Sequence, residues 1–194
     1  VHRRQRQMCI RDSDGWTPML IACSEGHLDI CKWLLQTIPE EKRVEALTTA
    51  DSHGRTPMMK ACRSGNLELC QWLFKVGATA AITKTDNDGT TPMQVAFATG
   101  NLAICKWLYE NMSTEKQIEA LTNKNKYGET AIHQACYQGH LDICEWLYQK
   151  MLPEQQIEAL IKTDSCGSTP MHGADQRGHL DICKWLLLNG ALNN

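Results

Sequence analysis

The sequence predicts an all-α fold, a helical solenoid of five helix–turn–helix repeats joined by short hairpin-like turns. Two glycine markers support this prediction, because both recur in step along the chain. The first marker recurs at intervals of 39, 35, 39 and 39 residues, at Gly15, Gly54, Gly89, Gly128 and Gly167. The second keeps the same spacing, at Gly26, Gly65, Gly100, Gly139 and Gly178. Two markers with one spacing indicate a repeated structural unit.

Each repeat begins with the residues of a turn and of a helix start. An Asp or Asn stands three residues before the first glycine, where its side chain can bond to the backbone two residues on. A threonine suited to be the N-cap comes next, followed by proline at the first helical position in Thr17, Thr56, Thr91 and Thr169. Repeat four has Thr130 followed by Ala131, which keeps the cap. The second glycine then ends this first helix in the left-handed conformation.

A second helix follows the second glycine in every repeat. Its Leu-x-Ile-Cys-x-Trp-Leu pattern, as in Leu28 to Leu34, places apolar residues at the i, i+3 and i+4 spacing of one helix face. One position of this helix is always tryptophan: Trp33, Trp72, Trp107, Trp146 and Trp185. An aromatic residue that recurs with the repeat is typical of stacking in a core, so we predict that all five are buried.

The string D-x-x-G-x-T-P-[apolar]-x-x-A-x-x-x-G-[HN]-L-x-[apolar] resembles the ankyrin repeat, whose period is 33 residues. The resemblance covers residues 12–194, with repeats at 12–50, 51–85, 86–124, 125–163 and 164–194. It implies a curved stack of L-shaped units, in which hairpin tips and first helices line a concave groove that binds other proteins. It also implies that His133 and His172 help to tie neighbouring units together.

The chain departs from the ankyrin pattern in its longer period of 35–39 residues. Three of the four junctions carry an insert with a shared E-A-L core after the second helix. Each insert has two apolar residues three apart: Val44 with Leu47, Ile118 with Leu121, and Ile157 with Leu160. This spacing predicts a short additional helix with one buried edge, packed over the junction.

The fifth repeat has Gly173 and Asp175 in its first helix, where other repeats have larger or less polar residues. Glycine costs about 1 kcal/mol against alanine inside a helix, and a buried unpaired carboxylate costs more. Either Asp175 faces solvent or this repeat frays. Since no polar capping repeat follows Leu188, we expect the chain to be a fragment of a longer array.

Residues 1–11 fit no repeat. The stretch VHRRQRQMCIR resembles a translated adaptor sequence, and we predict a non-native or disordered leader. The alternative is a basic arm that binds nucleic acid or directs the protein to the nucleus.

Composition excludes several classes of function. The formal charge is −2, but residues 12–194 alone hold sixteen basic against twenty-two acidic residues. Such a balance disfavours nucleic acid and anionic membranes unless basic residues cluster locally. No apolar run approaches the roughly 20 residues of a membrane span. The sequence has no nucleotide-binding loop, nucleophile elbow or kinase signature, so we predict that it is not an enzyme, with no catalytic residues, no cofactor and no small-molecule substrate.

The ten cysteines do not have the spacing of a disulfide scaffold. Five of them share one repeat position, and equivalent positions on packed helices lie about 8–10 Å apart, too far for a disulfide. A pair inside one repeat, such as Cys23 with Cys31, remains possible. Reduced thiols predict an intracellular, cytoplasmic protein. Pairs such as His27 with Cys31 could share a helix face, but no set of four ligands recurs, so we predict no metal site.

Function is expected where residues vary while the scaffold repeats, at the hairpin tips and the ends of the first helices. Because Tyr, Trp and Arg dominate interface hot spots, we select Trp16, Arg55, Arg63, Tyr127 and Tyr137 as partner-binding candidates. Trp16 is either a local staple over the first turn or an exposed anchor. These residues predict a monomeric module that binds an unidentified protein partner through the groove. The alternative is a structural or regulatory segment of a longer protein whose activity lies elsewhere.

Overall fold

The computed structural model describes residues 12–191, and every regular element in that range is helical. These residues fall into two compact units. The first ends at Val95 and the second begins at Ala96, so the boundary lies within helix α7 (Pro92–Ala98). None of the helices between residues 12 and 191 combines the length and apolar composition needed to cross a membrane. The predicted leader, residues 1–11, lies outside the described residues, as do residues 192–194.

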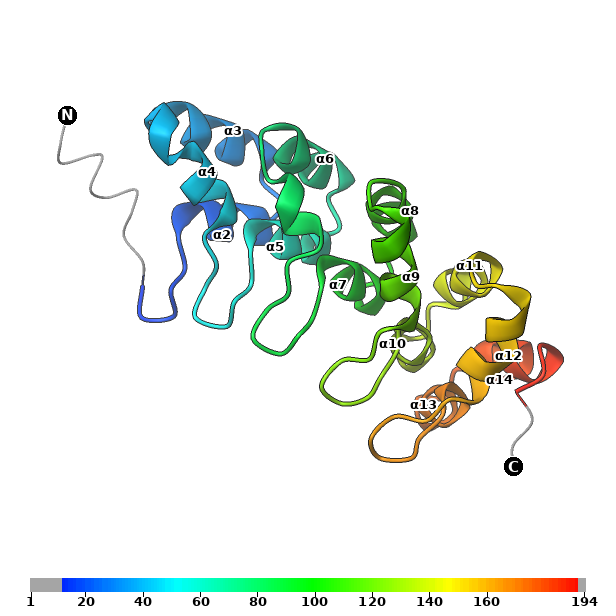
Figure 1. Ribbon diagram of the computed structural model, residues 1–194. Coiled ribbons are helices and arrows are strands. Elements are labelled where there is room, and N and C mark those ends of the chain that lie inside the picture. Colours follow the sequence, from blue (N-terminus) through cyan, green and yellow to red (C-terminus); the bar gives the residue numbers. More distant parts are fainter. Residues whose placement is uncertain (1–11, 192–194) are drawn as a thin grey trace. The chain divides into compact units, whose positions relative to one another are not determined.

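The first unit contains two complete helix pairs. Its elements are α2 (Pro18–Ser24), α3 (Leu28–Thr37), α4 (Glu40–Thr48), α5 (Pro57–Ser64), α6 (Leu67–Lys75) and the 3₁₀ helix η1 (Thr79–Ile82). Within each pair the helices pack together, α2 on α3 and α5 on α6, and the first helices α2 and α5 also contact each other. The turns before α2, α5 and α7 extend side by side on one side of the helices (Figure 1).

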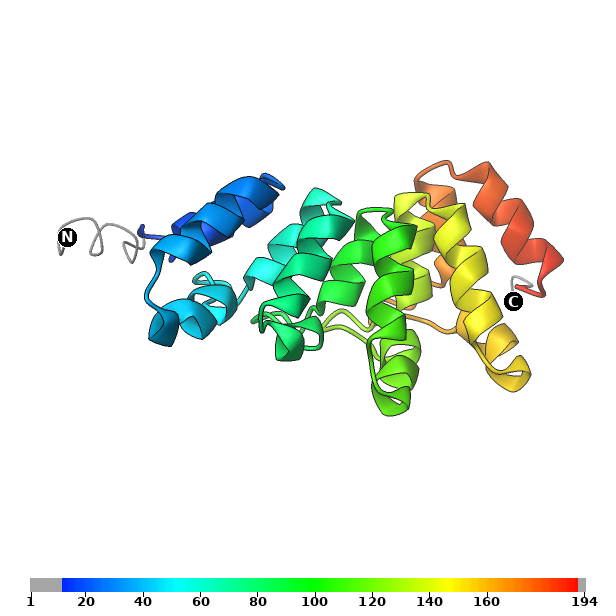
Figure 2. The ribbon, with the colours of Figure 1, turned by 90° about the horizontal axis from the view of Figure 1, so that it is seen from above.

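The second unit repeats this arrangement. Its elements are α8 (Leu102–Glu110), α9 (Thr114–Thr122), α10 (Ala131–Gln138), α11 (Leu141–Lys150), α12 (Pro153–Ile161), α13 (Pro170–Gln176) and α14 (Leu180–Leu188). The first helices α10 and α13 pack against each other, and the second helices α11 and α14 lie side by side (Figure 2). Both units therefore bury the facing sides of successive helix pairs, as the predicted solenoid requires.

The turn chemistry predicted from the sequence is confirmed. In each repeat the Oδ1 atom of the opening Asp or Asn accepts bonds from two backbone N–H groups, two and four residues on. In the first unit the tips also bond to each other, since Ser52 N donates to Asp14 O and Asn87 N donates to His53 O. Gly54, at φ +80°, leaves no room for a side chain, because a Cβ there would lie 2.8 Å from Asn87 N.

The predicted helix starts are also confirmed. The Oγ1 atoms of Thr17 and Thr56 accept bonds from the N–H groups three residues on, as N-cap residues do. Thr91 and Thr169 make the same bond, and Thr130 caps α10 without a following proline. The sequence could predict these features because each depends only on residues within one turn of chain.

The three inserts form helices α4, α9 and α12, as predicted. In the second unit α9 packs on α10 and α12 packs on α13, so both lie over repeat junctions. Their leucines Leu47, Leu121 and Leu160 are buried. The prediction was wrong for the other apolar residue of each pair, because Val44, Ile118 and Ile157 are exposed. With one side of each helix against the repeat, the leucine alone reaches the core.

Two of the insert helices, α9 and α12, each contain a glutamine that bonds to the helix before it and that the sequence did not single out. Gln117 Nε2 donates to Tyr109 O at 2.8 Å, and Gln156 Nε2 donates to Tyr148 O at 3.0 Å. Both acceptors are carbonyls in the last turn of a second helix, where intrahelical partners run out. The inserts therefore cap α8 and α11 in addition to burying a leucine.

The prediction that all five tryptophans are buried was wrong. Trp146 is buried, while Trp72, Trp107 and Trp185 are half-buried and Trp33 is 59% exposed. In the second unit, Trp146 and Trp185 each pack edge-on against a tyrosine of the preceding repeat. The ring centres are 5.4 Å apart for Trp146 and Tyr109, and 5.6 Å apart for Trp185 and Tyr148. Burial of Trp146 and Trp185 is thus partly provided by the preceding repeat.

The fifth repeat does not fray within the described residues. Its first helix α13 is complete, and Asp175 is exposed, which is one of the two outcomes the sequence left open. Gly173 faces Tyr137, and a Cβ at this position would meet the Tyr137 side chain at an ordinary van der Waals distance of 3.5 Å. The polar and small residues of this helix are therefore compatible with a folded repeat.

Two histidines link successive repeats of the second unit. His140 Nε2 lies 3.4 Å from Ala98 O, and His179 Nε2 lies 3.2 Å from Tyr137 O. The sequence placed these histidines at the start of their own helices, yet neither side chain caps its helix. In the first unit Asn66 Nδ2 also bonds across the junction, to Gly26 O at 2.9 Å. The polar residue after the second glycine therefore serves the junction between repeats.

His133 acts within its own helix start. Its Nδ1 atom accepts a bond from Thr130 N at 3.3 Å and lies 2.8 Å from Thr130 Oγ1. The side chain is buried, and burial lowers its pKa, although backbone bonds with Lys162, in the same repeat, and Ser168, in the next repeat, oppose this shift. In repeat three Gln94 makes the same bond, with Thr91 N donating to Gln94 Oε1 at 2.9 Å.

We expect His133 to make stability fall in mild acid. Because its pKa is lowered on folding, the unfolded chain takes up a proton at higher pH than the folded chain, so the free energy of unfolding decreases as pH falls below about 6.5. The His133→Gln variant copies Gln94 and should lose this contribution. Urea denaturation of both proteins between about pH 7.5 and 5 measures it. Equal acid sensitivity of the two proteins would contradict the prediction.

Candidate protein-binding surface

The five residues selected from the sequence fall into two groups. Trp16, Arg55 and Arg63 belong to the first unit, and Tyr127 and Tyr137 to the second. All five lie on turns or first helices, the elements that the predicted groove would use. The structure gives them different surroundings, which we describe for each unit separately.

Trp16 and Arg55 are both engaged with the buried residues Asp51 and Lys60. The Nζ atom of Lys60 lies 3.7 Å above the centre of the Trp16 ring, and Trp16 is half-buried. Arg55 Nε donates to Asp51 Oδ2 at 2.9 Å, and Arg55 Nη2 lies 3.1 Å from His53 Nδ1. Of the two interpretations left open for Trp16, the staple over neighbouring residues fits this geometry better.

The Asp51 carboxylate is the centre of this cluster. Its side chain is fully buried, and Oδ2 binds both Arg55 and Lys60 Nζ at 2.9 Å. Burial alone would raise the pKa of Asp51, but bonds from Lys60 and the Arg55 backbone hold it below its ordinary value. Burial lowers the pKa of Lys60, and Asp51 partly offsets this effect. A single carboxylate thus pairs with two cations.

Sequence reasoning missed Lys60, which lies where other repeats have Ile21, Val95, Gln134 and Gly173. The sequence did contain a signal for Lys60, because the other repeats have uncharged residues at this position of the first helix. Charged side chains are rarely buried without a partner, so a lysine there predicts a buried ion pair. No other repeat has this arrangement, since the residues equivalent to Arg55 are Trp16, Thr90, Glu129 and Ser168.

Arg63 lies one turn beyond Lys60 on α5 and is exposed. It lines a cavity of about 200 Å³ together with Arg55 and Lys60. The opposite wall comes from the next turn, with Asp86, Asp88 and Thr90. Two of the selected residues are therefore brought to one cavity.

In the second unit Tyr127 is the most exposed of the selected aromatic residues, with 57% of its surface accessible. Lys126 Nζ lies 4.9 Å from the centre of its ring. The scaffold uses only the backbone of Tyr127, whose N–H donates to Asn125 Oδ1 and whose carbonyl accepts from Ser165 N. The side chain is therefore available to a partner without loss of a turn bond.

Tyr137 is half-buried and held by the next repeat. Arg177 Nη2 donates to its hydroxyl at 2.6 Å, and the Arg177 guanidinium lies 4.2 Å from the ring centre. A stacked and hydrogen-bonded guanidinium fixes the ring in place. Together Tyr137 and Arg177 present a rigid aromatic and cationic pair on adjacent first helices α10 and α13.

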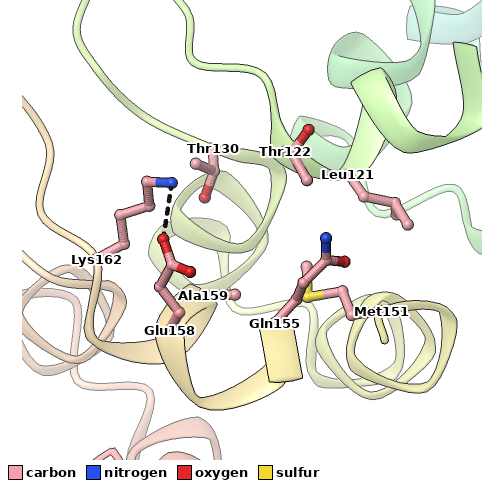
Figure 3. Close-up of a pocket in the computed structure, with 8 residues that line it drawn as sticks. All are labelled: Leu121, Thr122, Thr130, Met151, Gln155, Glu158, Ala159 and Lys162. Carbon is pink, nitrogen blue, oxygen red and sulfur yellow. Dashed lines mark hydrogen bonds and ion pairs between the residues drawn. The ribbon is translucent and has the colours of Figure 1, made fainter. Parts of the chain in front are cut away.

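A second cavity, of about 150 Å³, lies between the insert helices α9 and α12 (Figure 3). Leu121 and Met151 are buried beside it, and Glu158 and Lys162 form an ion pair at 3.3 Å on its rim. It contains none of the residues selected from the sequence. This cavity exists because of the inserts, which the shorter ankyrin period does not have.

The described cysteines are free thiols, and three pairs meet inside single repeats. The Sγ atoms are 3.7 Å apart in Cys23 and Cys31, 4.0 Å in Cys62 and Cys70, and 3.5 Å in Cys136 and Cys144. The thiol–thiol contact and burial raise the pKa of Cys23, and burial raises the pKa of Cys105 to about 12. Between residues 12 and 191 no group of three or more His, Cys, Asp or Glu side chains is arranged to hold a metal ion.

The fold and the variable turn surface define a class, the helical repeat proteins that present exposed loops and first helices on a stacked scaffold. Comparison with protein families identifies this one. A family model described as ankyrin repeats (3 copies) matches residues 3–84, 41–120, 77–159 and 115–194, so the chain belongs to the ankyrin repeat family. A search of curated proteins gave no match. Ankyrin repeats are generally protein–protein interaction modules and typically lack enzymatic activity.

Proposed function

We propose that this chain binds a partner protein through the groove of hairpin tips and first helices that its family resemblance implies, and that no cofactor takes part. The observation that carries this proposal is that one set of side chains builds each turn while another set stays exposed on it. Side chains of the repeated Asp, Asn, Thr and Gly residues build each turn, while residues such as Tyr127 contribute only their backbone to it. Exposed side chains on a rigid frame are suited to recognition, since little conformational entropy is lost on binding.

Tyr127 and Tyr137 are proposed as the anchors in the second unit. Both are aromatic side chains of the type that dominates interface hot spots. Arg177 holds Tyr137 in place, so a partner would meet a pre-organised ring. Trp16, Arg55 and Arg63 are proposed as the contributors in the first unit, with Trp16 and Arg55 partly committed to the Asp51 cluster.

The test begins with cross-linking of the purified chain in a lysate and identification of a captured protein. Affinity of that protein is then measured for Tyr127→Ala and Tyr137→Ala. We expect each substitution to weaken binding by about tenfold or more, as truncation of a hot-spot residue does. Trp33→Ala is the matched control, since Trp33 is an equally exposed aromatic residue on the second helix α3.

Circular dichroism and urea denaturation establish that each variant is folded. If folded Tyr127→Ala and Tyr137→Ala bind as tightly as the parent protein, the groove assignment is wrong. If Trp33→Ala alone weakens binding, the partner uses the second helices instead.

A further inference from the structure

The cavity beside α5 has more positive charge on one wall than the fold compensates. Arg55 and Lys60 share the single buried carboxylate of Asp51. Arg63, a turn further along the same helix, makes no hydrogen bond or ion pair with any residue in 12–191. Both arginines lie close enough to Lys60 to lower its pKa further, in addition to the larger effect of burial. Three cations therefore share this wall with one carboxylate, and Asp86 and Asp88 lie on the opposite wall.

The other carboxylates near this cavity are already engaged by the scaffold. Asp86 Oδ1 accepts bonds from Asp88 N at 2.9 Å and Thr90 N at 2.8 Å, as its counterparts do in every repeat. Asp88 also takes part in an interaction of its own. Asp51 has no exposed side-chain surface, so it cannot screen Arg63 from the solvent side. Among residues 12–191 the guanidinium of Arg63 has no ion-pair partner, although Asp86 and Asp88 keep their charge on the opposite wall of the cavity.

The shape of the site admits an anionic group. The cavity measures about 200 Å³, well above the roughly 10–15 Å³ that a single water molecule needs. Arg55 uses its Nε and Nη2 atoms for Asp51 and His53, which leaves Nη1 with both of its N–H groups. Because Asp51 holds Arg55 in position, this edge is pre-organised. Guanidinium groups bind carboxylates and phosphates through paired N–H donors.

We propose that this cavity binds an anionic side chain of the partner, a carboxylate or a phosphorylated hydroxyl, between Arg55 and Arg63. The inference rests on the proposed function and names the chemistry of the partner at this point of the surface. The surrounding chain carries more acidic than basic residues, so this site is a local exception that would select where an acidic segment docks. Lys60 lines the cavity, but its ammonium is held by Asp51 and Trp16, so we assign it a positioning role.

The experiment uses the complete chain and four pools of eight-residue synthetic peptides with mixed neutral flanks. The central residue is glutamate, phosphoserine, glutamine or lysine, and affinity is measured by titration at low and moderate salt. We expect the glutamate pool, the phosphoserine pool or both to bind at least tenfold more tightly than the glutamine and lysine pools. The ratio between the two anionic pools distinguishes a carboxylate from a phosphate.

Arg63→Gln is the decisive variant, since Arg63 is exposed and its loss should leave the fold intact. It should reduce binding of the anionic pool to the level of the glutamine pool. Lys75→Gln removes the same charge from an exposed position on α6, outside the cavity, and should bind like the parent protein. A twelve-nucleotide single-stranded oligonucleotide is included as a competitor and is expected not to displace the peptides.

Three results would overturn the proposal: equal binding of the anionic and glutamine pools, equal losses in Arg63→Gln and Lys75→Gln, or displacement of the peptides by the oligonucleotide. The last result would assign the arginines to nucleic acid. These failures are distinguishable from failure of the proposed function. If the charge of the peptide has no effect while Tyr127→Ala still weakens partner binding, the groove assignment stands and only the anionic pocket is lost.

Discussion

Replacing Asp51 with alanine is expected to lower the free energy of unfolding by about 3–5 kcal/mol, the cost of breaking a buried ion pair from one side. The carboxylate is fully buried and accepts four bonds, two from backbone N–H groups and two from Arg55 and Lys60. Without it, Lys60 either carries an unpaired charge or gives up its proton, in a site where only 5% of its side chain is exposed. Its stacking on Trp16 cannot replace an ion pair, because a cation–π contact contributes about 0.5–2 kcal/mol.

Asp86→Ala is the matched control for this prediction. Asp86 makes the same two turn bonds but binds no buried lysine, so its loss should cost about 1–2 kcal/mol. Asp51→Asn keeps the turn acceptor and removes only the charge. The double variant Asp51→Ala with Lys60→Met should regain much of the lost stability, because no buried charge then remains. Urea denaturation at neutral pH measures all four proteins. Equal losses for Asp51→Ala and Asp86→Ala would show that the ion pair contributes nothing.

The sequence predicted those parts of the fold that depend on a few adjacent residues. The bonds from Asp12 and its counterparts to the turn backbone are local, as are the threonine caps and the left-handed glycines. The insert helices were predicted for the same reason, since an apolar residue and its neighbours within two turns decide whether a short helix can form.

Burial could not be predicted as well, because it depends on residues about one repeat away. Trp146 and Trp33 occupy one position of the repeat, yet Tyr109 covers the first while the second is 59% exposed. Ile118 and Leu121 formed a plausible apolar pair in sequence, but only Leu121 faces the next repeat. Periodicity identifies a helix face and does not say how wide a strip of it the neighbour covers.

The candidate site shows the same division. Trp16 and Tyr137 looked free because their partners lie about one repeat away in the sequence. Lys60 and Arg177 supply the contacts across 44 and 40 residues of chain. Tyr127 and Arg63 are exposed, as a partner-binding residue should be. The variable positions of the repeat thus locate a surface. The pairing between repeats decides which side chains of that surface remain available to contact a partner.

The contact between repeats also gives the second glycine of the repeat a role besides ending the first helix, because it leaves room for the histidine of the next repeat. The Gly139→Ala variant tests this role. Gly139 has φ +85°, and a Cβ built on it would lie 2.6 Å from Cε1 of the His179 ring. A non-glycine residue in the left-handed region costs about 1–3 kcal/mol by itself. The added methyl group would also push His179 away from Tyr137 O, which it contacts at 3.2 Å. We expect a total loss of about 2–4 kcal/mol in the free energy of unfolding.

The double variant Gly139→Ala with His179→Ala separates the two contributions. Removing the imidazole relieves the steric conflict but not the backbone strain, so the effects should not add: the double variant should be more stable than the sum of the two single losses predicts. Gly178→Ala is the control, since Gly178 has φ +74° and a Cβ there meets nothing within 4 Å. Gly178→Ala should therefore lose only the free energy of unfolding that a non-glycine residue costs in the left-handed backbone conformation. If Gly139→Ala and Gly178→Ala lose equal stability, the close approach of the histidine ring has no energetic role, and the glycine is required only for its dihedral angle.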